Sequence, residues 1–197
     1  MKLKIYPIMF ILLSMLFLAF SAYSKESLTP NEGKIRIAVL DFKNSLKKNT
    51  DAQIGISASQ SFIGGILKSE QFEIINRTQI KSILNELNFS QTGYVDSEQA
   101  LKIGKLASAK YIVTGEITKG TWEKMKKKYG NDTQIWAKAT LLVTITEVET
   151  GKIVFSENID GMSQEYTNWT DSDMTPLFTE AAREAAKILA EKVINEL

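Results

Sequence analysis

The sequence predicts a single α/β domain in which a mixed β-sheet is flanked by helices. Short, almost continuously apolar runs alternate with amphipathic segments in the order β-α-β-α-α-β-β-β-α. Continuous apolar runs are typical of parallel strands covered on both faces, whereas strict alternation in a later segment indicates a half-buried antiparallel strand. The chain has 197 residues, of which 44% are hydrophobic, and this is enough to build one core of ordinary size.

The first predicted strand and helix occupy residues 35 to 69. Ile35–Phe42 is a mostly apolar run and predicts a buried strand, which a polar loop over Asn44–Thr50 follows. Asp51 is a suitable N-cap for the next helix. Gly64 and Gly65 lie inside this helix, where each glycine costs about 1 kcal/mol relative to alanine. We therefore expect the helix to approach the sheet closely at this pair; the alternative is a hinge or an oligomer contact.

Two further helices are predicted between the second and third strands. Phe72–Ile75 reads as a short strand, and Tyr111–Thr118 as a longer one. Asn76 and Asp96 are each followed three residues later by a glutamine, which is the pattern of a capping box at the start of a helix. The segment between the strands therefore forms two consecutive helices.

The C-terminal part predicts an antiparallel hairpin and a long helix. Gln134–Val148 alternates apolar and polar residues, and Ile153–Ile159 returns as its partner after turn residues at 149–152. Thr175 is the predicted cap and Pro176 the first residue of an amphipathic helix that runs to the end of the chain.

Residues 1–24 have the three parts of a secretory signal peptide. Two lysines within the first four residues precede an apolar run over Ile8–Phe20, and Ala22 and Ser24 stand at the −3 and −1 positions of a cleavage site. The apolar run is shorter than the roughly 18–20 residues of a spanning helix. The alternative is an uncleaved membrane anchor.

The expected organisation is a signal peptide over 1–24, an N-terminal tether over 25–34 and the α/β domain over 35–197. The chain has no cysteine, so it lacks the residue to which a bacterial lipoprotein attaches its lipid. An exported domain of this size without disulfides fits the bacterial periplasm. We expect a Sec-exported, non-lipidated periplasmic protein, with protein contacts as its means of association with the outer membrane.

Composition argues against catalysis. Without histidine or cysteine the chain has no Ser-His-Asp relay, thiolate nucleophile or zinc cluster, and 24 basic against 23 acidic residues do not suggest a nucleic-acid partner. No phosphate-binding loop is present. Asp41 ends the first strand, where an α/β crevice would hold a ligand. The alternative is that its side chain fixes the following loop. We predict that the chain is not an enzyme and that it has no cofactor-binding or metal-binding site.

Four segments, in order, resemble the curli production assembly/transport component family (CsgG-like proteins). They are IAVLDFKN at 37–44, FEIINR at 72–77, ALKIGKLASAKYIVTGEIT at 100–118 and VETGKI at 148–153. The resemblance implies a periplasmic α/β/α domain similar to nucleotide-binding folds, without a bound nucleotide. It also implies a non-enzymatic component of a CsgG-like, curli-type secretion or assembly system.

The chain departs from the family pattern at the segments where the archetype inserts membrane-spanning hairpins. Lys119–Thr133 has 15 residues and Ser163–Met174 has 12. Neither holds two strands of about 9–11 residues each, so we do not carry over the pore function. We expect docking on envelope proteins instead. The alternative is a periplasmic activator of a penicillin-binding protein, a class of cell-wall synthase regulator that looks similar.

These same two segments carry the predicted partner interface. Large aromatic side chains in loops are often interface anchors, and lysines accompany them here. The predicted interface residues are Trp122, Lys126, Lys127, Lys128, Tyr129, Tyr166 and Trp169. The expected partners are a secretion channel, a cell-wall synthase or further copies of the chain, with peripheral membrane association. The alternatives are a solvated loop and aromatic rings packed on the domain's own edge.

Overall fold

The computed structural model describes residues 33–47, 51–89, 95–126, 133–167 and 174–197. The predicted signal peptide, and the tether as far as residue 32, lie outside the described residues. None of the helices in the described ranges has the length and apolar character needed to cross a membrane.

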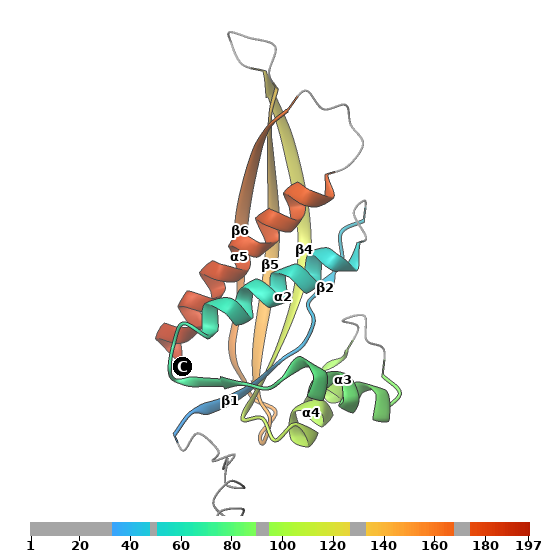
Figure 1. The fold of residues 1–197 in the computed structure, drawn as a ribbon, viewed down its shortest axis with the longest axis vertical. Coiled ribbons are helices and arrows are strands. Elements are labelled where there is room, and N and C mark those ends of the chain that lie inside the picture. Colours follow the sequence, from blue (N-terminus) through green and yellow to red (C-terminus); the bar gives the residue numbers. More distant parts are fainter. Residues whose placement is uncertain (1–32, 48–50, 90–94, 127–132, 168–173) are drawn as a thin grey trace, which may run out of the picture. The chain divides into compact units, whose positions relative to one another are not determined.

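A six-stranded mixed sheet forms the centre of the domain (Figure 1). Its strands are β1 (Ile35–Val39), β2 (Lys43–Asn44), β3 (Phe72–Ile74), β4 (Tyr111–Lys126), β5 (Thr133–Glu147) and β6 (Ile153–Thr167). The strand order is β3-β1-β4-β5-β6, and β2 pairs with β4. β1 runs parallel to β3 and β4, whereas β5 runs antiparallel to both of its neighbours, β4 and β6. The predicted α/β class with a mixed sheet is confirmed.

Helices cover the two faces of the sheet unequally. α2 (Ala52–Ile66) and α5 (Thr175–Glu196) lie on one face, over a core that includes Phe62, Leu141 and Leu189. α3 (Arg77–Glu86) and α4 (Ser97–Leu106) form a second, smaller core with residues of β1 and the start of β4. The crossover from β1 to β3 therefore uses one face and the crossover from β3 to β4 the other.

The helix starts confirm part of the predicted capping. The capping box of Asp96 and Gln99 is confirmed, because each side chain bonds the other residue's backbone N–H. Asn76 is also an N-cap, but its Oδ1 accepts a bond from the backbone N–H of Thr78 and not from that of Gln79, as the predicted capping box requires. The prediction that Thr175 caps α5 is wrong by one residue: Met174 is the N-cap and makes no side-chain cap bond.

Three predicted boundaries are corrected. The segments 119–133 and 163–174 were expected to be loops, but β4 continues to Lys126 and β6 to Thr167. Both strands pair with β5, which satisfies the backbone groups on the side of β5, and a register shift between Ile117 and Lys119 absorbs one residue. β1 ends at Val39 and not at Phe42, and the short strand β2, which was not predicted, overlaps the predicted polar loop at Asn44.

The glycine pair of α2 approaches a helix rather than the sheet. A Cβ atom at Gly65 would lie 2.4 Å from the Cβ of Ala190 in α5, whereas a Cβ at Gly64 would meet nothing within 4 Å. Only Gly65 is therefore explained by packing within the described part of the chain.

Candidate functional site

Three of the predicted interface residues lie in the far halves of the long strands. We name residues 119–126 of β4, 133–139 of β5 and 161–167 of β6 the distal strand segment. The three strands are paired across the sheet, so that each residue of β5 lies between one residue of β4 and one of β6, which together form a row. Lys126, Thr133 and Thr167 form the row at the far end of the described strands. In Figure 1 the strands continue beyond the ends of α2 and α5. The outermost rows therefore extend beyond the helical layer.

Trp122 lies on a strand and not in the predicted loop. It pairs with Ala137 of β5, which in turn pairs with Ser163 of β6. Ala137 is 1% exposed and Ser163 is 8% exposed, but Trp122 is 44% exposed. The Nζ atom of Lys124 lies 5.3 Å from the centroid of the indole ring, within the range of a cation–π contact.

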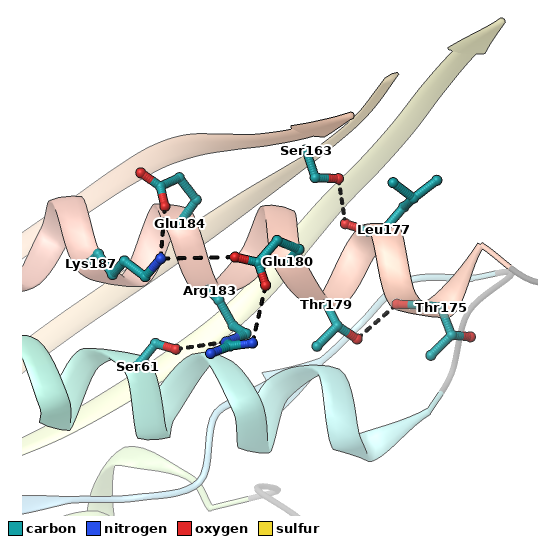
Figure 2. A network of polar contacts seen from close by, with 9 residues as sticks. All are labelled: Ser61, Ser163, Thr175, Leu177, Thr179, Glu180, Arg183, Glu184 and Lys187. Carbon is teal, nitrogen blue, oxygen red and sulfur yellow. Dashed lines mark hydrogen bonds and ion pairs between the residues drawn. The ribbon is translucent and has the colours of Figure 1, made fainter. Parts of the chain in front are cut away.

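The exposure of Trp122 follows from its position at a sheet edge. β2 pairs with β4 at Glu116 and Ile117, so the described part of β4 beyond these residues has no strand on its other side. α5 covers the neighbouring strands: Ser163 Oγ donates a 2.7 Å bond to the carbonyl oxygen of Leu177 (Figure 2). α5 reaches β4 at Gly120, where a Cβ atom would lie 2.8 Å from the ring of Phe178, but Trp122, two residues further along, is still 44% exposed on the open edge.

Lys126 and Tyr166 reach the same end of the sheet from different strands. Tyr166 pairs with Gln134, which also pairs with Met125, so the backbones of Lys126 and Tyr166 lie in adjacent rows on either side of β5. Only the backbone positions of these two residues are described. The other predicted interface residues, Lys127, Lys128, Tyr129 and Trp169, lie outside the described residues.

The opposite face of the strands carries a polar cluster that sequence analysis missed. Asp160 accepts a 2.6 Å bond from Thr140 Oγ1 and forms a 2.6 Å ion pair with Lys138. The hydrogen bond from Lys138 and then that from Thr140 lower the pKa of Asp160, and the charges of Lys138 and Lys119 add to the effect. Met162 lies beside this cluster, paired with Lys138, and is 60% exposed. The face therefore combines a fixed charge pair with an exposed apolar side chain.

A cleft of about 380 Å³ lies where β1 and β4 adjoin. Because the crossover from β1 to β3 and the crossover from β3 to β4 lie on opposite faces, this is the switch point at which open α/β sheets bind ligands. Asp41 lines the cleft, and its two carboxylate oxygens lie 2.6 and 2.7 Å from Nη2 of Arg77 at the start of α3. Asp41 therefore fixes α3, rather than the loop that follows β1.

A second carboxylate in the cleft is also neutralised. Glu116 accepts a 2.5 Å bond from Ser45 Oγ and lies 3.2 Å from Nζ of Lys43. The Ser45 bond is the largest cause of a lowered pKa at Glu116; burial opposes the shift, and Lys43 reinforces it. A general acid at neutral pH needs a raised pKa, so this geometry favours a structural role. In the described ranges no three His, Cys, Asp or Glu side chains are placed to hold a metal ion.

The missed cluster did leave a signal in the sequence. Asp160, Met162 and Gln164 alternate with smaller or apolar residues, which continues the period of two beyond the predicted end of the strand. The low hydrophobicity of this stretch hid the pattern. Trp136, in contrast, has a buried indole N–H without a hydrogen-bond partner among the described residues, which the sequence could not predict.

The chain belongs to the family described as "Curli production assembly/transport component CsgG". The family model matches residues 19–171, which is most of the chain. The match confirms the resemblance inferred from the four sequence segments. No curated protein sequence matches the chain at a significant level.

The chain is also similar, at low identity, to solved structures of bacterial proteins. The hypothetical protein CT253 from Chlamydia trachomatis is 10% identical, with a TM-score of 0.50, covering 83% of this chain and 97% of that one. Lipoprotein GNA1162 from Neisseria meningitidis is 12% identical, with a TM-score of 0.48 and coverage of 82% and 96%. The C-terminal domain of LpoB from Salmonella enterica is 12% identical, with a TM-score of 0.43 and coverage of 73% and 90%. The likeness to CT253 shows the fold.

Proposed function

We propose that this chain is a non-enzymatic periplasmic component of a CsgG-like secretion or assembly system, and that it docks on envelope proteins through the distal strand segment. The observation that carries the proposal is the strand register. It gathers Trp122, Lys126 and Tyr166, which are up to 44 positions apart in the sequence, at one end of the sheet.

The geometry of Trp122 supports an interface role. Tryptophan is enriched among the residues that dominate binding energy, and such residues work best when binding removes them from water. Trp122 is 44% exposed on an open strand edge, so a partner has both a ring face to cover and unpaired backbone groups to meet. Lys124 adds a positive charge beside the ring.

The expected location follows from the signal-peptide pattern of residues 1–24 and from the absence of cysteine. Export places the docking surface in the periplasm, and the chain cannot be lipidated on a cysteine. Contacts with outer-membrane or secretion proteins then hold it at its site of action.

In-cell photo-crosslinking of the full chain tests the proposal. A photoreactive phenylalanine replaces Trp122 in one strain and Tyr166 in a second, and replaces Glu86 at the exposed end of α3 in a control strain. Adducts are identified by mass spectrometry. We expect both test positions to capture the same secretion or outer-membrane protein, with or without further copies of the chain, and the control position not to capture it.

Two outcomes contradict the proposal in different ways. If a penicillin-binding protein is the main adduct, the proposed secretion or assembly function is wrong and the alternative, activation of a penicillin-binding protein, is favoured. If the test positions capture nothing beyond what the Glu86 position captures, the distal strand segment is not the docking surface.

A further inference from the structure

A groove of about 510 Å³ lies between α2 and α5 on their solvent-facing side, separate from the distal strand segment. Small or polar residues of α2 form one wall, and two cations of α5 form the other. The lining residues are Ser57, Gln60, Ser61, Gly64, Gly65, Lys68, Arg183 and Lys187.

Gly64 is unexplained by the packing of the described chain. A glycine inside a helix costs about 1 kcal/mol relative to alanine, and this cost is usually offset by a close contact. Gly65 has such a contact with Ala190, but a Cβ at Gly64 would enter open space in the groove. A close approach by a second molecule accounts for a glycine at this position.

The groove is basic, and its cations are held in place. Arg183 donates from Nε to Ser61 Oγ at 3.2 Å and from Nη1 to Glu180 at 3.1 Å, which ties α5 to α2 (Figure 2). Lys187 forms a 3.1 Å ion pair with Glu184. Lys68 has no ion-pair partner among the described residues. Three cations therefore surround two carboxylates and leave one positive charge in excess.

An apolar group stands beside the basic end of the groove. Leu67 follows Gly64 by three residues and is 58% exposed, although it is a large aliphatic side chain. A partner that fills the groove next to Gly64 would also reach Leu67. Burial of such a side chain contributes about 1.5–3 kcal/mol when it is complete.

We propose that this groove binds an α-helix of a partner protein and that the bound helix carries carboxylate side chains toward Lys68, Arg183 and Lys187. Ser57, Ser61 and Gly64 recur at about one helical turn, so α2 presents a shallow channel that admits the side-chain ridge of another helix. The excess positive charge selects an acidic ridge, because complementary charge gives an interface its specificity. The proposal is independent of docking by the distal strand segment.

The test captures the partner and then changes the groove. A photoreactive phenylalanine at Gln60 of the full chain is crosslinked in the cells that produce it, and the adduct peptide is mapped by mass spectrometry. We expect an acidic, helix-forming segment of another protein. Gly64→Gln fills the channel and Lys68→Glu reverses the unpaired charge, so each lowers the yield by about tenfold or more, equivalent to about 1.4 kcal/mol.

Lys81→Glu is the matched control, because Lys81 is an exposed lysine on α3, outside the groove; the yield should not change. A Glu→Lys change in the captured segment should restore the adduct of the Lys68→Glu chain. The proposal is wrong if the photoreactive residue at position 60 captures nothing, or if it captures a second copy of the chain, a lipid or a protein segment without carboxylates. It is wrong as well if Lys68→Glu leaves the crosslinking yield unchanged. It is also wrong if Gly64→Ala lowers the melting temperature of the free chain, since Gly64 then serves the chain itself.

Discussion

Gly65 of α2 and Ala190 of α5 are in contact so close that a Cβ on residue 65 would lie 2.4 Å from the Cβ of Ala190. The two helices therefore pack at the distance that a glycine permits. Gly65→Ala should push them apart and lower the free energy of unfolding by about 1–3 kcal/mol, the usual cost of overpacking. Urea denaturation of the purified chain measures the change.

The neighbouring glycine supplies the opposite prediction. Gly64→Ala adds a methyl group in open space within a helix, so it should raise the free energy of unfolding by about 0.4–1 kcal/mol. If Gly64→Ala and Gly65→Ala lower the free energy of unfolding equally, the space around each glycine does not determine the effect of its substitution, and the prediction is wrong. The pair is its own control, because the two positions are adjacent and the substitution is identical.

Gly161 of β6 has even less space. A Cβ there would lie 1.9 Å from the carbonyl oxygen of Ala181 and 2.4 Å from the backbone nitrogen of Ala185, and a helix backbone cannot yield as a side chain can. Gly161→Ala should destabilise the domain by about 3 kcal/mol or more. Asn158→Ala, an exposed position on the same strand, should change stability by about 0.5 kcal/mol at most. Similar losses in both variants would show that strand propensity, and not the α5 contact, matters.

The pair of Asp41 and Arg77 should behave as a coupled unit. It joins the end of β1 to the start of α3, and the side chains are 20% and 31% exposed. Either Asp41→Asn or Arg77→Gln should cost about 1–3 kcal/mol, as is usual for hydrogen bonds to charged groups. The double variant should cost less than the sum of the two, which a double-mutant cycle detects. Additive losses would show that the two groups act separately.

The order of all the elements except β2 could be predicted from the sequence, because that order depends on local patterns. The apolar runs at β1 and β4 and the cap at Asp96 each reveal their own secondary structure. The far ends of β4 and β6 do not. Lysine, glutamate and glycine there lower the local strand propensity, and it is pairing with β5, a contact between distant residues, that makes them strands.

The candidate site was only partly predictable for the same reason. Trp122 was identified from its residue type, but its position on an open edge depends on where β2 stops pairing with β4. Of the glycine pair, only Gly65 marks a close approach, and its partner is α5 and not the predicted sheet, because the partner depends on which helices share a face of the sheet. The cluster around Asp160 requires the register of β5 against β6, which no single segment encodes.

Glu116 should make the stability of the domain depend on pH in the acid range. Its pKa is lowered in the folded state from an ordinary value of 4.5, so ionised Glu116 favours folding. This contribution is complete above the ordinary value and is lost as the pH falls through the lower, folded value. The gap in unfolding free energy between the natural chain and Glu116→Gln should therefore shrink as the pH falls below about 4.5.

The Ser45 hydroxyl should have more influence on this titration than Lys43, because its hydrogen bond is the largest cause of the lowered pKa. In Ser45→Ala, the pKa of Glu116 should rise toward its ordinary value and by more than in Lys43→Met, as measured by NMR titration of the carboxyl carbon. Asp160 depends on Lys138 and Thr140 instead, so its titration in the same spectra should stay unchanged. A larger rise in Lys43→Met would mean that charge, and not the short hydrogen bond, holds Glu116 ionised.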